Sequence, residues 1–133
     1  MNEHQESVAK ACLRAAEENA MTFPEIIGRL MRSGFEGYAI DFRRATATYY
    51  LASGESIDLA SHKTSVPVAA AFDAAQLEAA IKEAQMLVPG YTYKGFCKKA
   101  CAAGCAGYLV SFTGRRALYV GRTAETHVEH FPN

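Results

Sequence analysis

The hydrophobic period of this chain changes from helical to strand-like at Phe35 and does not become helical again until Asp73. Before Phe35, apolar residues recur every three or four positions, as in amphipathic helices. From Phe35 to Leu59, apolar and polar residues alternate, as in half-buried strands. Strands grouped between helices in this way do not form the βαβ units of a parallel sheet. The pattern therefore predicts an α+β fold with an antiparallel sheet.

Helical patterns cover residues 3–20, 22–33, 73–88 and about 93–103. The second and third begin at capping boxes, Thr22-Phe23-Pro24-Glu25 and Asp73-Ala74-Ala75-Gln76, in which a polar side chain and the residue three positions later satisfy each other's backbone amides. Gly34 is placed to end the second helix in a left-handed conformation. Residues 61–71 remain open between an edge strand and an ordered loop, because Pro67 argues against a central strand.

Strand patterns cover residues 35–43, 46–51, 56–59, 106–113 and 116–122, and residues 126–131 allow a last one. A type II′ turn at Gly114-Arg115 is predicted to join two of them. We expect about five strands in one sheet, helices packed mainly on one face, and no internal repeat. The predicted sheet side of the core consists of Phe35, Ile40, Phe42, Tyr50, Leu51, Ile57, Leu59, Leu109, Val110, Phe112, Leu118 and Val120.

Length and charge exclude several classes of protein. With 133 residues, the chain is expected to form a single domain over residues 1–133. Its net charge of zero leaves no basic field for a phosphate backbone, so general nucleic-acid binding is not expected. The N-terminal sequence Met1–Glu6 is acidic and no apolar run is long enough to cross a membrane, so we expect a cytoplasmic protein without membrane contact.

The four cysteines are expected to be reduced thiols in that compartment. Cys97, Cys101 and Cys105, with His127 and His130, offer thiolate and imidazole ligands of the kind zinc prefers. Their spacing on a helical turn differs from that of zinc knuckles, so we predict neither a metal site nor a cofactor. Among the thiols, only Cys97 lies near a helix start and beside lysines, where a lowered pKa is plausible.

A second group of residues suggests a small-molecule pocket between the strand of Asp41 and the C-terminal hairpin. Asp41 or His127 would transfer the proton, Arg122 would anchor a carboxylate or phosphate, and Tyr38 and Tyr119 would orient the ligand through their hydroxyls. These roles require all five side chains to reach one cavity. The alternatives assign these residues no functional role: the polar residues near the C-terminus would form a solvated strand edge, and the tyrosines would be ordinary packing residues.

A series of short motifs along nearly the whole chain resembles a known family. They are Phe23-Pro24, Gly37-Tyr38 with Asp41, Thr48-Tyr49-Tyr50 with Gly54-Glu55, Gln85, Tyr93, Phe96, Ala103-Gly104-Cys105, Tyr119-Val120-Gly121-Arg122 with Glu125, and His127-Val128-Glu129-His130-Phe131-Pro132. The series resembles a small bacterial and prophage-borne domain-of-unknown-function family whose members are often labelled phage envelope protein. The resemblance implies no assigned activity and no catalytic residues. The family commonly has glycine where this chain has Ala124.

Two hypotheses of different class follow from the residues. The leading one is a non-enzymatic binding or interaction module, with a homodimer or another protein as its partner, because no nucleophile–base pair, phosphate loop or strong metal pattern can be read and the tyrosines and strand edges suit protein contacts. The alternative is a small-molecule-binding domain or enzyme that uses the pocket of Asp41, Arg122 and His127.

Overall fold

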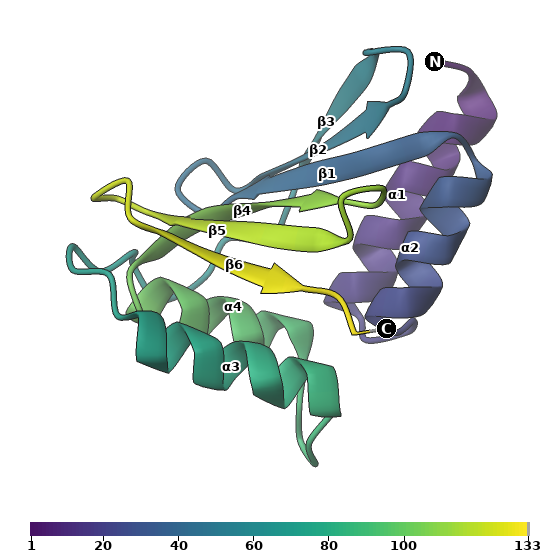
Figure 1. The fold of residues 1–133 in the computed structure, drawn as a ribbon. Helices are drawn as coiled ribbons and strands as arrows, with labels where there is room; N and C mark the ends of the chain where they lie inside the picture. The colour runs from purple at the N-terminus through teal and green to yellow at the C-terminus, as the bar shows by residue number, and fades with distance from the viewer. Residues whose placement is uncertain (133) are drawn as a thin grey trace.

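The computed structural model describes residues 1–132 as four helices and one six-stranded sheet (Figure 1). The elements are α1 (Glu3–Glu17), α2 (Phe23–Arg32), β1 (Phe35–Asp41), β2 (Thr46–Leu51), β3 (Ser56–Ala60), α3 (Ala74–Met86), α4 (Tyr93–Ala102), β4 (Cys105–Ser111), β5 (Arg116–Gly121) and β6 (Thr126–His130). The strand order is β3-β2-β1-β4-β5-β6, and every neighbouring pair is antiparallel. The predicted α+β fold is confirmed, with six strands rather than about five because β6 pairs with β5.

Local side-chain bonds start the helices where the sequence predicts. Thr22 accepts from the backbone amide of Glu25, and the Glu25 carboxylate accepts from the amide of Thr22, which completes the capping box. The Asp73 carboxylate likewise accepts from the Gln76 amide at 3.0 Å, but the predicted capping box is incomplete, because the Asp73 amide donates to the Ala103 carbonyl and not to the Gln76 side chain. Gly34 follows α2 with a φ of +96°, in the left-handed region that stops a helix.

The expectation of no internal repeat is wrong, because the chain is built from two ααβββ units. Residues of the second unit lie 70 positions after their equivalents in the first. The β1–β2 pair Phe35↔Leu51, for example, recurs in β4–β5 as Cys105↔Gly121. Residues 35–60 and 105–130, which cover the strands and turns of the two units, share six identical residues, at 37/107, 38/108, 42/112, 47/117, 49/119 and 55/125. So few identities hide the repeat in the sequence, whereas the pairing register displays it.

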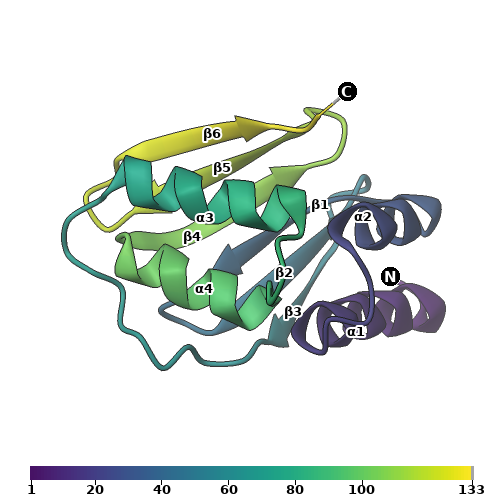
Figure 2. The same ribbon diagram turned by 90° about the horizontal axis from the view of Figure 1, so that it is seen from below.

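The two units meet at the β1–β4 pair, in the middle of the sheet. Gly37 pairs with Ser111 and Asp41 pairs with Gly107, so the pairing is symmetric about Ala39↔Leu109. The helices lie on one side of the sheet, with α3 and α4 across the β4–β6 half and α1 and α2 toward the other end (Figures 1 and 2). We call the side that carries the helices the inner face and the opposite side the outer face.

The inner face is more aromatic than the sequence predicts. Tyr38, Tyr49, Tyr108 and Tyr119 are buried there, whereas four residues of the predicted core, Tyr50, Leu109, Leu118 and Val120, lie on the outer face. Those four assignments are wrong because β2, β4 and β5 carry apolar or aromatic residues on both faces, so their sequences do not reveal which face is covered. The other predicted core residues pack inward, with Ile57 and Leu59 only half-buried.

Two connections differ in detail from the expectations. Residues 61–73 form an ordered loop, not a strand, and its Ala69 and Asp73 amides donate to the carbonyls of Cys101 and Ala103 around the end of α4. The β4–β5 hairpin has four linking residues instead of the predicted two-residue type II′ turn. Its left-handed residue is Arg115, with a φ of +51°, rather than Gly114.

Ala124 occupies a left-handed position at the β5–β6 turn, with a φ of +66°. Its equivalent in the first unit is Gly54, at +96°. Ala124→Gly should raise the free energy of unfolding by about 0.5–1 kcal/mol, because the strain it relieves exceeds the chain entropy that glycine adds to the unfolded state. Urea unfolding checks this, with Ala60→Gly in β3 as a control that should be destabilising. A destabilised Ala124→Gly would contradict the strain argument.

Candidate functional site

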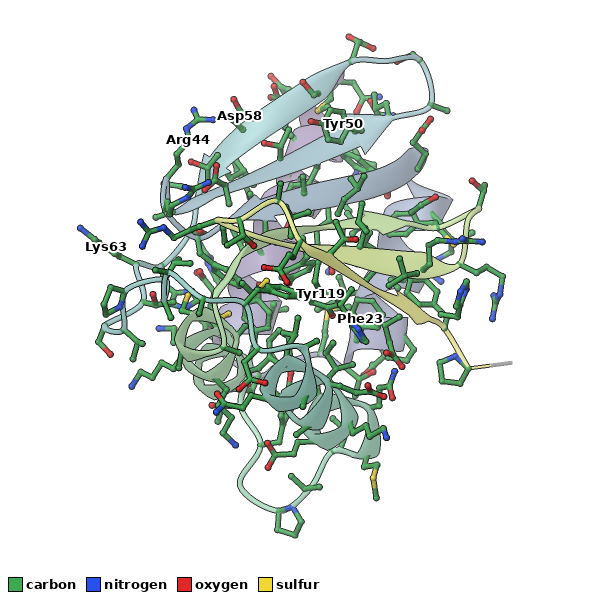
Figure 3. All side chains as sticks on the ribbon, turned by 60° about the vertical axis from the view of Figure 1, so that its left-hand side comes forward. Phe23, Arg44, Tyr50, Asp58, Lys63 and Tyr119 are labelled. Carbon is green, nitrogen blue, oxygen red and sulfur yellow. The ribbon has the colours of Figure 1, made fainter. Side chains whose placement is uncertain are left out.

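The structure brings together three of the five predicted pocket residues on one face of the sheet. Tyr38, Tyr119 and His127 belong to the inner face: Tyr119 pairs with His127 across β5 and β6, and their rings lie 6.4 Å apart. Figure 3 shows Tyr119 on the side of the sheet that holds the helices. The strand alternation directs Asp41 to the outer face, so it does not join them.

Asp41 and Arg122 have local roles in turns and loops. The Asp41 carboxylate accepts from the backbone amides of Arg43 and Arg44 at 3.0 and 3.1 Å, which caps the β1–β2 turn. Arg122 donates to the Val68 carbonyl at 3.3 Å, so the β5–β6 turn is held against the loop before α3. Neither side chain is directed at the inner-face tyrosines by these bonds.

The inner-face tyrosines pack against one another. The rings of Tyr38 and Tyr49 stack at 5.4 Å, those of Tyr108 and Tyr119 lie at 5.2 Å, and the Tyr108 hydroxyl shares a 2.7 Å hydrogen bond with that of Tyr93 on α4. Burial raises the pKa of Tyr38, Tyr93 and Tyr108 well above the ordinary value. These phenols therefore remain neutral hydrogen-bonding groups at any physiological pH.

Two glutamate–histidine pairs border this aromatic layer. His62 Nδ1 lies 2.9 Å from Glu17 Oε2, and its Nε2 is buried without a protein partner. His127 Nε2 lies 3.2 Å from Glu129 Oε2, while Glu129 Oε1 accepts from Gln85 on α3 at 3.3 Å. The second pair replaces two aliphatic residues: the equivalents of His127 and Glu129 in the first unit are Ile57 and Leu59. The two units thus differ in chemistry at this edge of the inner face.

The four cysteines are free and buried. Burial raises the pKa of Cys97 to about 12 and that of Cys105 to about 11, and it also raises the pKa of Cys12 and Cys101. The expectation of a lowered pKa for Cys97 is therefore wrong, because removal from water outweighs its place near a helix start. Within residues 1–132, no group of three or more His, Cys, Asp or Glu side chains is arranged to hold a metal ion.

These thiols make the protein less stable in alkali. The unfolded chain releases a cysteine proton near pH 9, whereas the folded chain keeps that of Cys97 until about pH 12. The contribution of this group to stability is complete below about pH 9 and declines as the pH rises toward 12, by at most about 1.4 kcal/mol per pH unit. Urea unfolding between neutral pH and alkaline pH should show the decline, and Cys97→Ala should reduce its slope. Native thiols that react rapidly with a disulfide reagent at neutral pH would contradict it.

Two shallow pockets lie away from the five predicted residues. One, of about 290 Å³, is bordered by the start of α1 and the β2–β3 turn, including Gln5 and Glu55. The other, of about 180 Å³, lies between α3 and α4 and is bordered by Tyr91, Phe96 and Lys99. Neither is lined by Asp41, Arg122, His127, Tyr38 or Tyr119.

The outer face shows the clearest asymmetry of the molecule. Strand register aligns one row of residues across all six strands: Asp58, Thr48, Ala39, Leu109, Leu118 and Val128. The β1–β3 end of the row is polar, with the Thr48 hydroxyl bonded to the Asp58 carboxylate at 2.6 Å. The β4–β6 end is aliphatic. Leu109 and Val128 are 45% and 41% exposed, and Val120 lies beside Leu118 on the same face.

We call these four residues, Leu109, Leu118, Val120 and Val128, the aliphatic patch. The sequence interpretation missed it because it assigned three of them to the core and Val128 to a polar run. The alternation along the strands could have revealed the patch. If the tyrosines at positions 38, 49, 108 and 119 face the helices, the aliphatic residues next to them must lie on the uncovered face. An exposed group of large aliphatic side chains on one face is a recognised mark of an interaction surface.

Fold and surface together define a two-layer α+β domain made of a duplicated ααβββ unit, with a packed aromatic interior and one uncovered sheet face. The chain belongs to the family described as Protein of unknown function (DUF1398), whose model matches residues 12–128. No curated protein matches the chain. None of the helices within residues 1–132 is both long and apolar enough to cross a membrane.

Proposed function

We propose that this chain is a non-enzymatic interaction module and that it binds a protein partner through the aliphatic patch on its outer face. The observation that carries the proposal is the exposure of Leu109 and Val128 on a face opposite the helices. Burying such side chains against a partner contributes about 25 cal/mol per Å² of apolar surface. The buried, neutral thiols and phenols of the interior support a structural rather than a catalytic role for most of its reactive groups.

The motif resemblance and the chemistry of the cysteines also suggest where the protein is located and in what kind of organism. Four free thiols suit a reducing compartment, so we place the protein in the cytoplasm of a bacterium or of a cell carrying a prophage.

Photocrosslinking tests the patch directly. A photoreactive amino acid at position 118 should form a covalent adduct with a partner in cells, since Leu118 is at the centre of the patch. The matched control is position 48, the equivalent place in the first unit, on the polar half of the same face. Adducts from position 118 but not 48 support the proposal. Absence of adducts at 118, or equal adducts at both positions, contradicts it.

A second candidate function is the binding of a small polar ligand at the β6 edge of the inner face, where the His127 and Glu129 side chains are partly exposed. It is favoured by the His127–Glu129 pair, which replaces two aliphatic residues of the first unit and is held by Gln85. An imidazole fixed by a carboxylate is suited to exchange a proton with a ligand. His127→Ala should then abolish ligand-induced thermal shifts, whereas His130→Ala, on the outer face, should preserve them. Equal shifts in both variants contradict this candidate.

A further inference from the structure

We infer that the partner of the aliphatic patch is a second copy of this chain, stacked outer face to outer face over β4–β6 with a two-fold axis along the row Leu109–Leu118–Val128. The inference rests on the proposed function, because it names the occupant of the same surface. It is carried by the strand register, which defines the neighbours of each patch residue, and by the distribution of charge around the patch.

The patch is complementary to itself. A two-fold axis along the row places Leu109, Leu118 and Val128 each opposite its own copy, so these three aliphatic side chains meet each other and none of them faces a charge. Two of the surrounding outer positions are small: Gly107, which pairs with Val120, and Ser111, which pairs with Arg116. Small residues between larger ones leave room for the partner's side chains, as in two sheets packed about 10 Å apart.

Charge selects the direction of the axis. Arg116 and His130 are cross-strand neighbours at one end of the patch, and Val120 and Thr126 are neighbours at the other. An axis parallel to the strands would place Arg116 against Arg116 of the second copy, where like charges repel. An axis along the row exchanges the two ends, so that Arg116 faces the partner's Val120 instead.

The same arrangement gives Arg116 an acidic neighbour. Glu125 lies in the β5–β6 turn, immediately beyond Val120 and Thr126, and its carboxylate is bonded to the Thr123 hydroxyl at 2.7 Å. The Arg116 guanidinium donates to the Gly114 carbonyl of its own chain, at 3.0 Å. Arg122 of the same turn is directed to the Val68 carbonyl, and Glu125 is the acidic residue of the turn that follows Val120. Symmetry forms this Arg116–Glu125 pair twice.

The interface is small. The outer positions of β4–β6 number nine: Gly107, Leu109, Ser111, Arg116, Leu118, Val120, Thr126, Val128 and His130. A standard protein–protein interface uses roughly 20–30 residues on each side. We therefore expect a dimer that forms and dissociates with concentration, rather than an obligate one.

Sedimentation of the purified full chain tests the inference over about a hundredfold range of concentration. The unmodified chain should shift from monomer to dimer. Leu118→Lys should weaken the dimer by at least about tenfold, because it places two ammonium groups on the axis. Thr48→Lys, at the equivalent position of the first unit, should leave the dimer unchanged. Thermal melting of each variant checks that the fold is retained.

The charge pair tests the direction of the axis. Arg116→Glu and Glu125→Arg should each weaken the dimer about five- to tenfold, and the double variant should recover most of the loss. Failure of the double variant to recover would overturn this axis. A chain that stays monomeric at every concentration would overturn the second-copy inference. If position 118 still yields a photoadduct with a different protein, the proposed function survives that result.

Discussion

Gly104→Ala is expected to lower the free energy of unfolding by about 3 kcal/mol or more. Gly104 follows α4 with a φ of +87°, where a residue with a side chain is strained by about 1–2 kcal/mol. An added Cβ would also lie 2.7 Å from the Ala71 carbonyl carbon and 2.9 Å from the Phe72 Cα. Because these are backbone atoms, the loop before α3 must move to accept it.

The repeat supplies a matched control for this substitution. Gly34 occupies the equivalent position after α2, with a φ of +96°. A Cβ on Gly34 would meet only side-chain atoms, Gln5 Nε2 at 3.3 Å and Leu51 Cδ2 at 3.9 Å. Gly34→Ala should therefore lose only the backbone strain, about 1 kcal/mol. Urea unfolding of both variants measures the difference, and equal losses would show that the contact with Ala71 is unimportant.

Leu30→Ala and Leu77→Ala are each expected to lose about 2–5 kcal/mol, since each removes a completely buried side chain from a packed core. Leu30 lies on α2 of the first unit and Leu77 on α3 of the second. Both variants should unfold in one transition, because the β1–β4 pairing joins the two units into a single sheet. This result would support a single domain over residues 1–133.

Met86→Ala is the control for this pair, because Met86 is 75% exposed at the end of α3 and should change stability by less than about 0.5 kcal/mol. Unfolding in two separate transitions, with Leu30→Ala affecting only one of them, would mean that the ααβββ units are independent. The circular dichroism and tyrosine fluorescence signals should coincide during urea unfolding if the units are coupled.

The candidate site could be predicted only in part. Tyr38, Tyr119 and His127 share the inner face, because strand alternation and register put them there. Asp41 lies on the other face for the same reason, one residue away from Ile40. The Glu17–His62 and Gln85–Glu129 contacts join residues more than 40 positions apart, so no local sequence pattern predicts them.

The sequence by itself determined the local structure: the helix starts at Thr22 and Asp73, the helix stop at Gly34, and the strand runs between them. Capping bonds and apolar periodicity act within a few residues, so they can be read without knowing the fold. Only the tertiary structure decided that the units repeat, that tyrosines rather than Leu109 and Leu118 face the helices, and that an aliphatic patch remains uncovered. Those features depend on strand register, because a shift of one residue exchanges the two faces of a strand, and register is set by pairing between distant segments.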